Sequence, residues 1–388
     1  MSEYQYYEFL AVDRPLTNDE RAELRKISTR AEITSSRFVN EYNYSDLRGD
    51  PHAILARYFD VFIYLANWGT NRLTMRFPAD LLDIEQLRPY IANDGEYMEF
   101  GGPFVLIDSG YGCMLLDVWN DTDEPEEWLE CTGWMDSLAG LRDDILGGDL
   151  RALYLAWLSG VQNEQIELDE IEPPVPPGLG ELSDPLLSLA EFLRLDEYLL
   201  EAAAERSGPW REGGLTGLDE WVAALPGDEK DALLAQVVRG EDAHVSTRLL
   251  RRFRAEGEVA NGDAAGAART AAELGQCADA LLAIHEAEEA RHAEQERLQR
   301  EKIALAERAI YLAKLAGQET RLWSEAEELI VSKRQKAYVQ AVSTLVDLRD
   351  LASWSGEEEA FARRFASLYR RHRRKSTLIA RIRNAGLT

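Results

Sequence analysis

Proline is absent after Pro226, although thirteen prolines lie in the chain up to that point. Glycine is also absent between Gln276 and Ala316. Because proline and glycine are the residues that most disfavour a helix interior, their absence predicts one continuous helix over this stretch, about 60 Å long at 1.5 Å per residue. A compact domain does not need so long a helix, so we expect the chain to be organised around it.

Cysteine is also scarce. Cys113, Cys131 and Cys277 are the three cysteines of the 388 residues, and none is spaced as a CxxC pair. This number and spacing argue against a disulfide framework and against a thiolate zinc site. The sequence has no apolar run of about 18 residues and no basic and apolar leader at its start. We therefore expect a cytoplasmic protein that does not enter a membrane.

Catalytic and cofactor motifs are missing as well. The chain contains no GxxxxGK[ST], GxGxxG, GxSxG or HExxH pattern. His285 and His292 are seven residues apart, which on one helix is about 10 Å and too far for one metal ion without another element. We predict no catalytic residue, no cofactor and no metal, and thus a protein that is not an enzyme. A cysteine and histidine pair that meets only in the fold remains an open alternative.

Charge is distributed unevenly along the chain. The formal net charge is −27, and residues 101–200 carry 22 acidic and 3 basic side chains. Residues 361–388 carry 9 basic side chains and no acidic one. An acidic region can serve solubility alone, whereas a wholly basic terminus indicates an anionic partner more readily.

Residues 1–163 are predicted to form a small α/β domain at the start of an α+β protein. Strands are expected at 4–12, 32–42, 72–77, 103–107 and 113–119, and helices at 15–28, 51–68, 138–146 and 150–159. The helix at 51–68 is inferred from Ile54, Tyr58, Phe62 and Leu65, which would share one face. We expect the helices to lie mostly on one face of the sheet. Arg37, Arg72 and Arg76 would then face outward, as a cationic patch or as an ordinary solvated face.

Acidic and aromatic residues alternate between Asp117 and Glu130. A calcium loop is disfavoured because the sixth position is not glycine and Pro125 interrupts the acids. A surface for a basic protein partner fits the composition better, since tryptophan anchors an interface and carboxylates steer the encounter. The candidate partner-binding residues are Trp119, Glu126, Glu127 and Trp128.

The rest of the chain divides by composition. Residues 164–184 contain Pro173-Pro174-Val175-Pro176-Pro177 and are predicted to be an acidic, stiff linker. A helical domain follows at 185–260, and then a long helix or coiled-coil arm at 268–316. Leu298, Leu305 and Leu312 are seven apart there, so homo-oligomerisation through 277–316 is open. Residues 317–388 are predicted to form a solenoid-like helical hairpin cap with a basic end.

The last forty residues, from Leu348-Arg349-Asp350-Leu351 through Tyr369-Arg370-Arg371-His372-Arg373-Arg374-Lys375 to Ala385-Gly386-Leu387, carry a resemblance. They are similar to the helical ends of bacterial proteins with SWIM-type zinc fingers, and the whole chain resembles a bacterial protein. The cysteine and histidine ligands of that finger have no counterpart here. The resemblance therefore implies neither zinc nor nucleic-acid binding.

Three functions remain after these exclusions. The first is a non-enzymatic interaction or scaffold subunit of a bacterial multi-protein system, with another protein as its partner. The second is a nucleic-acid-associated subunit that would use Arg370, Arg371, Arg373, Arg374 and Lys375 for phosphates. The third is an acidic mimic of nucleic acid. The same arginines could instead form a solvated helix end or pair with the acidic half of the chain.

Overall fold

The computed structural model describes residues 3–91, 104–108, 110–121, 133–210, 217–239, 243–256 and 268–387. The chain divides into two compact units, Met1–Ile284 and His285–Thr388. The first contains a sheet covered by helices and the second is helical. The predicted α+β class is confirmed.

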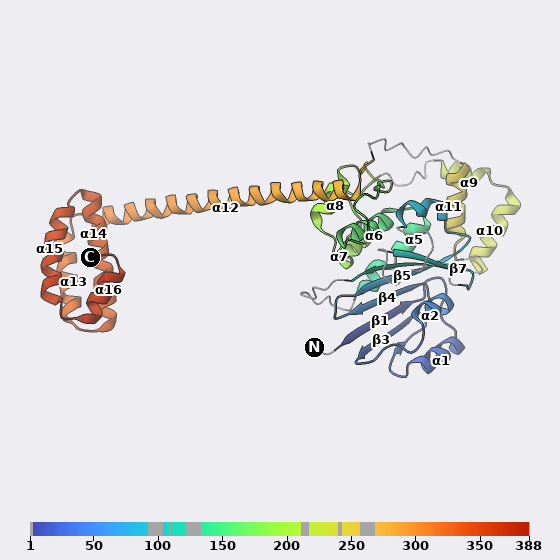
Figure 1. Cartoon of the computed structure of the whole chain (residues 1–388), viewed down its shortest axis with the longest axis horizontal. Coiled ribbons are helices and arrows are strands. Elements are labelled where there is room, and N and C mark those ends of the chain that lie inside the picture. The colour runs from blue at the N-terminus through green and yellow to red at the C-terminus, as the bar shows by residue number, and fades with distance from the viewer. Residues whose placement is uncertain are drawn as a thin grey trace. The chain divides into compact units, whose positions relative to one another are not determined.

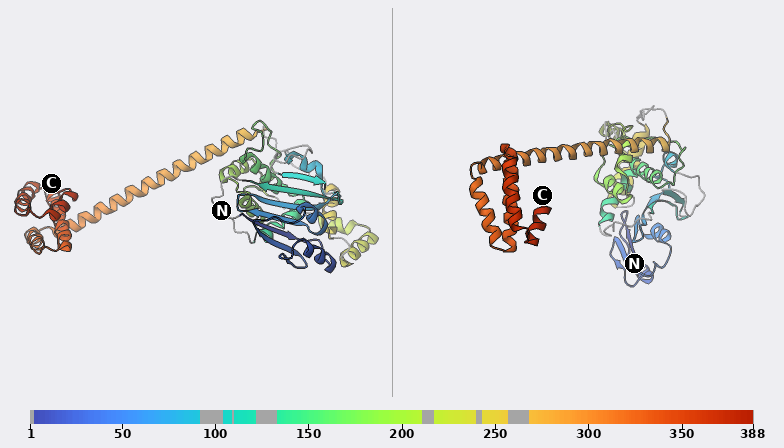
Figure 2. Two further views of the ribbon diagram at one scale, coloured as in Figure 1. Left: turned by 60° about the horizontal axis from the view of Figure 1, so that its bottom comes forward. Right: turned by 60° about the vertical axis from the view of Figure 1, so that its left-hand side comes forward.

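The first unit is built on one seven-stranded sheet in which every pairing is antiparallel. The strand order is β2-β3-β1-β4-β5-β7-β6, and Figures 1 and 2 show how the strands lie. The strands are β1 (Tyr4–Leu10), β2 (Glu32–Ile33), β3 (Arg37–Asn43), β4 (Val61–Ala66), β5 (Asn71–Pro78), β6 (Phe104–Asp108) and β7 (Cys113–Asn120).

Strand β4 corrects the predicted helix at 51–68. The helix α2 (Pro51–Tyr58) ends at Tyr58, and the chain then enters a strand between β1 and β5. Val61 and Ile63 are fully buried on one face of the sheet while Phe62 is buried on the other. A strand buried on both faces is a continuous apolar run, which periodicity cannot distinguish from a helix.

Helices cover both faces of the sheet, not mostly one as predicted. On one face α1 (Asn18–Ile27) and α2 pack over Phe9 and Phe38. A capping box between Thr17 and Glu20 starts α1, because each side chain accepts a hydrogen bond from the other residue's backbone N–H. The other face carries the larger core. Its helices are α3 (Ile84–Leu87), the 3-10 turn η1 (Arg88–Tyr90), α4 (Trp134–Leu138), α5 (Leu141–Leu146), α6 (Arg151–Gln162), α7 (Asp184–Phe192) and α8 (Glu197–Ala204).

The proline-rich segment belongs to this core and does not separate two domains. Ile166 and Leu179 are buried with the helices on the second face of the sheet. The Tyr90 hydroxyl donates to the carbonyl of Pro174 at 2.7 Å, and Ser207 Oγ donates to that of Pro176 at 2.8 Å. Composition predicted a stiff linker, but hydrogen bonds from residues before and after the segment in the sequence hold it against the core.

The region predicted as a helical domain is split in the structure. Helices α7 and α8 join the sheet core, whereas α9 (Leu218–Ala224), α10 (Gly227–Arg239) and α11 (Val245–Glu256) pack together. Trp221 of α9 meets Phe253 of α11 edge to face, with ring centroids 5.6 Å apart. Neither α9 nor α10 contains a buried residue.

Helix α12 (Ala271–Leu315) is a single helix of 45 residues. The lack of glycine and proline predicts it from Gln276 onward, and the helix begins five residues earlier, so it includes Gly275. Its first turns place Ala271, Leu274 and Ala278 in the core of the first unit. Every residue from Leu282 to Glu307 is exposed. This helix therefore has a packed beginning and a long solvated middle.

The second unit is a helical bundle, in the region where a solenoid-like helical hairpin was predicted. Its helices are α13 (Glu319–Val331), α14 (Gln335–Ser355), α15 (Glu358–His372) and α16 (Ser376–Asn384). Ala326, Leu345, Leu368 and Ile382 are fully buried where the four helices meet. None of the helices in the described ranges combines the length and apolar character that crossing a bilayer requires.

Candidate functional site

The predicted partner-binding residues can be placed only in part. Trp119 lies on β7, opposite Arg72 of β5, and is half-buried. Glu126, Glu127 and Trp128 lie outside the described residues. The structure therefore leaves the acidic and aromatic surface as a prediction.

The three arginines expected on an open face form neither a cationic patch nor a solvated face. Arg37 donates to the buried Glu8 at 2.9 Å and also pairs with Asp136. Arg72 pairs with Asp117, and Arg76 with Asp60. Both of these aspartates are at most 3% exposed. Arg72 and Arg76 lie on the face of Phe62, which the prediction left open and which α1 and α2 cover. Arg37 lies on the other face, beside Asp136 of α4. Each arginine thus pairs with a buried carboxylate.

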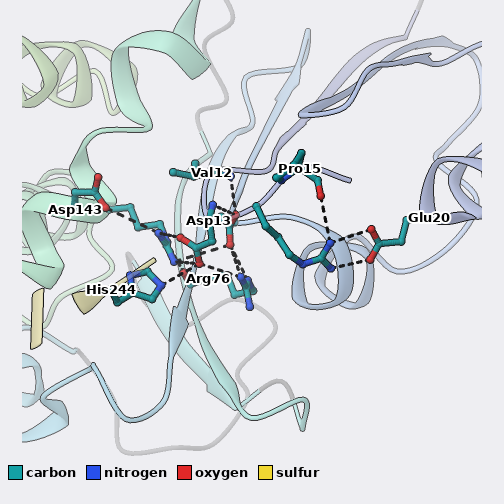
Figure 3. Close-up of polar contacts among 10 residues, drawn as sticks. Val12, Asp13, Pro15, Glu20, Arg76, Asp143 and His244 are labelled. Atoms are coloured by element: carbon teal, nitrogen blue, oxygen red, sulfur yellow. Dashed lines mark hydrogen bonds and ion pairs between the residues drawn. The ribbon is translucent and has the colours of Figure 1, made fainter. Parts of the chain in front are cut away.

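One cluster of charges gathers around Asp13, after the end of β1 (Figure 3). Arg142 of α5 donates to both carboxylate oxygens of Asp13, at 2.8 Å each, and its Nε donates to the carbonyl of Arg76 at 2.7 Å. Arg76 also reaches Asp13 at 3.2 Å. Arg142 is 1% exposed, so its charge depends on these partners.

Asp60 completes this cluster. Its Oδ2 accepts hydrogen bonds from the backbone N–H groups of Val12 at 2.7 Å and of Asp13 at 2.9 Å. Burial acts to raise the pKa of Asp60, but the Arg76 charge and these hydrogen bonds outweigh it and hold the pKa below its ordinary value. Burial acts to lower the pKa of Arg76, but the charge of Asp60 and its hydrogen bond outweigh burial and raise this pKa above its ordinary value. The pair is thus charged at neutral pH.

His244 brings the helical region onto the same cluster. Its Nε2 lies 3.1 Å from Oδ2 of Asp13, and it directly precedes α11. Asp13 and His244 are 231 positions apart, and Asp13 and Arg142 are 129 apart. No local pattern could have indicated these contacts, and the sequence reasoning missed all of them.

A second buried cluster surrounds Asp117 of β7. Arg72 Nε donates to its Oδ1 at 2.8 Å, Thr74 Oγ1 donates at 2.7 Å, and His52 Nε2 lies 3.2 Å from Oδ2. Burial acts to raise the pKa of Asp117, but the hydrogen bonds from Arg72 and His52 hold it below its ordinary value. The hydrogen-bonding capacity of Asp117 is therefore used by its neighbours. Through these contacts it links β7 to β5 and to the start of α2.

Sites for metals or reactive thiols find no support in the described ranges. No group of three or more histidine, cysteine, aspartate or glutamate side chains there could hold a metal ion. Cys113 is buried and Cys277 is half-buried, while Cys131 lies outside the described residues. A shallow hollow on α13, bordered by Ser324, Glu327 and Ser332, is open to solvent. The buried charged clusters are consistent with structural roles.

The basic residues predicted to contact phosphates lie at the end of α15 and just beyond it. Three of the five have hydrogen-bond partners within the unit. Arg371 donates to Glu327 of α13 at 2.6 Å, and Lys375 Nζ donates to the carbonyl of Ile330 at 2.8 Å. Arg370 makes a hydrogen bond to a backbone carbonyl of its own helix. Arg373 and Arg374 are exposed, and in the part of the chain that the structure describes neither pairs with a carboxylate.

Three further cations lie beside these residues, and the sequence analysis did not single them out. Lys333 and Arg334 are exposed in the connection from α13 to α14, and Lys336 is exposed in the first turn of α14. Their proximity follows from the contact of Lys375 with Ile330, three residues before Lys333. Burial and the charge of Lys333 both lower the pKa of Lys375. The C-terminal ends of α13 and α15 thus bring two basic segments together.

Exposed apolar side chains gather on α12. Leu298 is 43% exposed, Ile303 49%, Leu305 71% and Ile310 58%. Leu298 and Leu305 are seven residues apart and so lie on one face. The third leucine of the predicted seam, Leu312, is buried.

No protein-family model, curated protein or solved structure matches this chain.

Proposed function

We propose that the protein is a non-enzymatic scaffold subunit of a bacterial multi-protein system, acting in the cytoplasm and binding another protein through the exposed middle of α12. The observation that carries this proposal is the run of exposed residues from Leu282 to Glu307 in a helix that contains large apolar side chains.

Local ion pairs contribute little to the stability of this exposed segment. Such pairs join Glu288 to Arg291, Glu294 to Arg297, and Glu296 to Arg300. Each such pair on a helix surface is worth about 0.2 to 0.5 kcal/mol, so together they supply about 1 kcal/mol. Most helices in proteins are stabilised mainly by packing an apolar face. A partner that covers Leu298 and Leu305 would provide that packing.

The pattern of residues favours a helix as the partner's contacting element. Leu298 and Leu305 define one face, with Lys302 between them and Ala309 after them. The leucines recur every two turns, but the other positions of this face hold a lysine and an alanine, which bury less apolar surface. This pattern suits pairing with a short helix better than a long coiled coil. The occupant that we propose is a helix of a different protein, and a second copy of this chain is the competing outcome.

The absence of an enzymatic role is supported by how the buried polar groups are used. Asp13, Asp60 and Asp117 each accept several hydrogen bonds from neighbouring arginines or backbone groups. Such groups stabilise the sheet and its covering helices. They leave little capacity for proton transfer, because their oxygens are already occupied by donors. The lowered pKa of Asp60 and of Asp117 also makes each of these two a weak base.

The test uses the full chain with a photo-crosslinking amino acid in place of Leu305, and a matched chain with the same replacement at Glu307. The two positions point about 160° apart on the helix. Irradiation in lysate of the source bacterium should give one dominant adduct from position 305 and little from 307. Mass spectrometry of that adduct should identify a heterologous protein crosslinked through a helix.

A second pair of variants checks that the apolar face is responsible. Leu298→Gln with Leu305→Gln should remove the partner in co-purification, whereas Arg300→Gln with Glu307→Gln, on the opposite side, should retain it. Both pairs leave the net charge unchanged. An adduct with twice the mass of the chain would make α12 a homodimer contact instead. If neither position gave an adduct, the proposal would lose its basis.

A further inference from the structure

A group of cations at one end of the second unit has no role in the proposed contact on α12. We call this group the basic end surface, and it consists of Lys333, Arg334, Lys336, Arg370, Arg371, Arg373, Arg374 and Lys375. Two separate segments supply it. One is the connection between α13 and α14 with the first turn of α14, and the other is the end of α15 with the residues that follow.

The two segments are held together by specific contacts. Arg371 pairs with Glu327 at 2.6 Å, and the Lys375 ammonium donates to the last turn of α13 at Ile330. These contacts use part of the charge of the group but leave most of it available. In the described residues, no carboxylate pairs with Lys333, Arg334, Lys336, Arg373 or Arg374.

Acidic side chains are scarce around this surface. Helices α14 and α16 both begin here, and neither has an acidic residue in its first turn. The residues at their N-caps are Arg334 and Lys375, where an aspartate, serine or threonine is usual. Basic residues at a helix start oppose the helix dipole, so this arrangement lowers the stability of the isolated unit. An anionic ligand bound here would offset this loss of stability.

We propose that the basic end surface binds the phosphate backbone of nucleic acid without preference for base sequence. Five of its eight members are arginines, whose planar guanidinium groups match phosphate oxygens in pairs of parallel hydrogen bonds. All eight members are lysines or arginines, which contact phosphates and carry no base-sequence information in doing so. This inference goes beyond the scaffold role and does not depend on it.

A membrane surface fits the geometry less well. An interfacial helix inserts its apolar face between lipids, but the apolar face of α15 is already used within the bundle, where Phe365 and Leu368 are buried. The large apolar side chains exposed nearby are two valines, Val331 and Val339. The observations therefore favour a soluble polyanion over a lipid headgroup layer.

The experiment measures binding of the full chain to labelled 20-base-pair DNA and 20-nucleotide RNA of scrambled sequence, by fluorescence anisotropy between about 50 and 200 mM salt. The wild-type chain should bind at about 50 mM salt with an affinity that falls steeply as salt rises, because counterions are released from phosphates. Changing Lys333, Arg334, Lys336, Arg373 and Arg374 to glutamine should lower the log–log salt slope for duplex DNA by about 4 to 5.

A control variant with the same net charge shows whether any loss of binding comes from the basic end surface or from the change in net charge. Five exposed cations elsewhere are changed to glutamine in it: Lys26, Arg30, Arg48, Lys314 and Arg321. It should keep the wild-type affinity and slope to within about one unit, and circular dichroism should show both variants folded. A smaller variant, Lys333→Gln with Lys336→Gln, should lower the slope by about 2.

Several outcomes would overturn the proposal. The first is no binding to either nucleic acid at about 50 mM salt, and the second is an equal loss in the control of equal charge. Polyglutamate of similar length that competed as well as DNA would indicate an acidic protein segment as the ligand. Stronger retention on phosphatidylserine vesicles than on DNA would indicate a membrane.

Discussion

Glu172 and Arg269 are 97 positions apart in the sequence and form a two-pronged ion pair inside the first unit. Arg269 Nε donates to Oε2 of Glu172 at 2.8 Å, and its second nitrogen donates to Oε1 at 2.6 Å. Both side chains are 3% exposed. The Tyr154 hydroxyl donates to the same carboxylate at 2.5 Å, and the Glu172 backbone N–H donates to the carbonyl of Arg269 at 2.8 Å. This pair fixes the proline-rich segment against the start of α12.

Replacing Arg269 with alanine should be strongly destabilising. It would leave the buried Glu172 charge with the neutral Tyr154 hydroxyl and one exposed cation at 4.0 Å, Arg206. Loss of the buried partner of a charge typically costs about 3 to 5 kcal/mol. The matched control is Arg206→Ala, because Arg206 reaches the same carboxylate at 4.0 Å but is 41% exposed and should cost less than about 1 kcal/mol. Urea unfolding followed by amide exchange in the sheet measures both. Similar losses for the two variants would show that the burial of the pair is unimportant.

The proline-rich segment should also resist proteases in the native state. Its carbonyls at Pro174 and Pro176 are tied to Tyr90 and Ser207, and Ile171 forms a bridge with Thr270. Cleavage between residues 164 and 184 should therefore require opening of the first unit, and Arg269→Ala should accelerate it in proportion to the stability lost. The measurement is the rate of cleavage at those bonds by thermolysin. Fast cleavage of the wild-type chain there would restore the interpretation of this segment as an exposed linker.

Acid should act on the first unit partly through Asp117. Its pKa in the folded state lies below the ordinary value of 3.8, so the carboxylate stabilises the fold above that value and this contribution is lost as pH falls below it. Asp117→Asn should lower the free energy of unfolding at pH 7 by about 1 to 3 kcal/mol, since Arg72 and Thr74 lose a charged acceptor. The difference between variant and wild type should stay constant from pH 7 to about 4 and shrink below it.

Urea titrations at pH 7, 4 and 3 test this dependence. The control is Asp136→Asn, which changes an aspartate that is 70% exposed and should cost less than about 1 kcal/mol at pH 7. A difference for Asp117→Asn that stayed the same at pH 3 as at pH 7 would mean that the carboxylate is not the source of the stabilisation.

The sequence predicted most helices and strands but not the partners of the buried charges. Helix α12 was predictable because helix-breaking residues are absent over a long interval, which is a local property. Strand β4 was not, since the apolar run from Val61 to Leu65 fits either a buried strand or a helix. Arg72 and Arg76 read as outward residues because strict alternation marks two faces, but nothing local says that the second face is also covered.

Contacts between distant residues explain the rest of the differences. The basic end surface joins Lys333 to Lys375 across two helices, so the sequence analysis found the cluster after Arg370 and missed the cations near Lys333. The cluster of Asp13, Arg142 and His244 arises in the same way. Composition alone also misjudged the proline-rich segment, because its role depends on the glutamate within it and on an arginine almost a hundred residues later.

His244 should control how firmly α11 is held to the sheet. It contacts Asp13 at 3.1 Å, and Arg248 of the same helix contacts Asp80 at 3.0 Å on the surface. His244→Ala should raise the hydrogen-exchange rates of α11 roughly tenfold or more, because a hydrogen bond to a charged group contributes about 1.5 to 3 kcal/mol. Exchange in β5 should not change, since Asp13 keeps its bonds to Arg142.

The comparison for this prediction is His292→Ala, on the exposed part of α12. It should leave the exchange of α11 as in the wild-type chain. Unchanged rates in His244→Ala would assign the attachment of α11 to Arg248 and to the buried Val245 instead.

Three glycines allow backbone strain to be separated from steric overlap. Gly178 has a φ of +87°, and a Cβ there would lie 2.7 Å from Cβ of Trp210 and 3.1 Å from a guanidinium nitrogen of Arg151. Gly217 also has a φ of +87°, but a Cβ there would meet nothing within 4 Å. Gly180 has the same open space and no positive φ. Alanine at position 178 therefore adds both strain and overlap. Alanine at position 217 adds strain alone, and alanine at position 180 adds neither.

We expect the free energy of unfolding to follow that order. Gly180→Ala should be neutral to within about 0.5 kcal/mol, and Gly217→Ala should cost about 1 kcal/mol for an alanine in the left-handed region. Gly178→Ala should cost a further 1 to 3 kcal/mol, roughly, because Trp210 must move and its ring stacks on Arg151, whose guanidinium carbon lies 3.6 Å from the ring centroid. Calorimetry of the full-length variants gives the three values. A Gly178→Ala chain as stable as Gly217→Ala would mean that Trp210 is displaced freely, and that its stacking on Arg151 contributes nothing to the first unit.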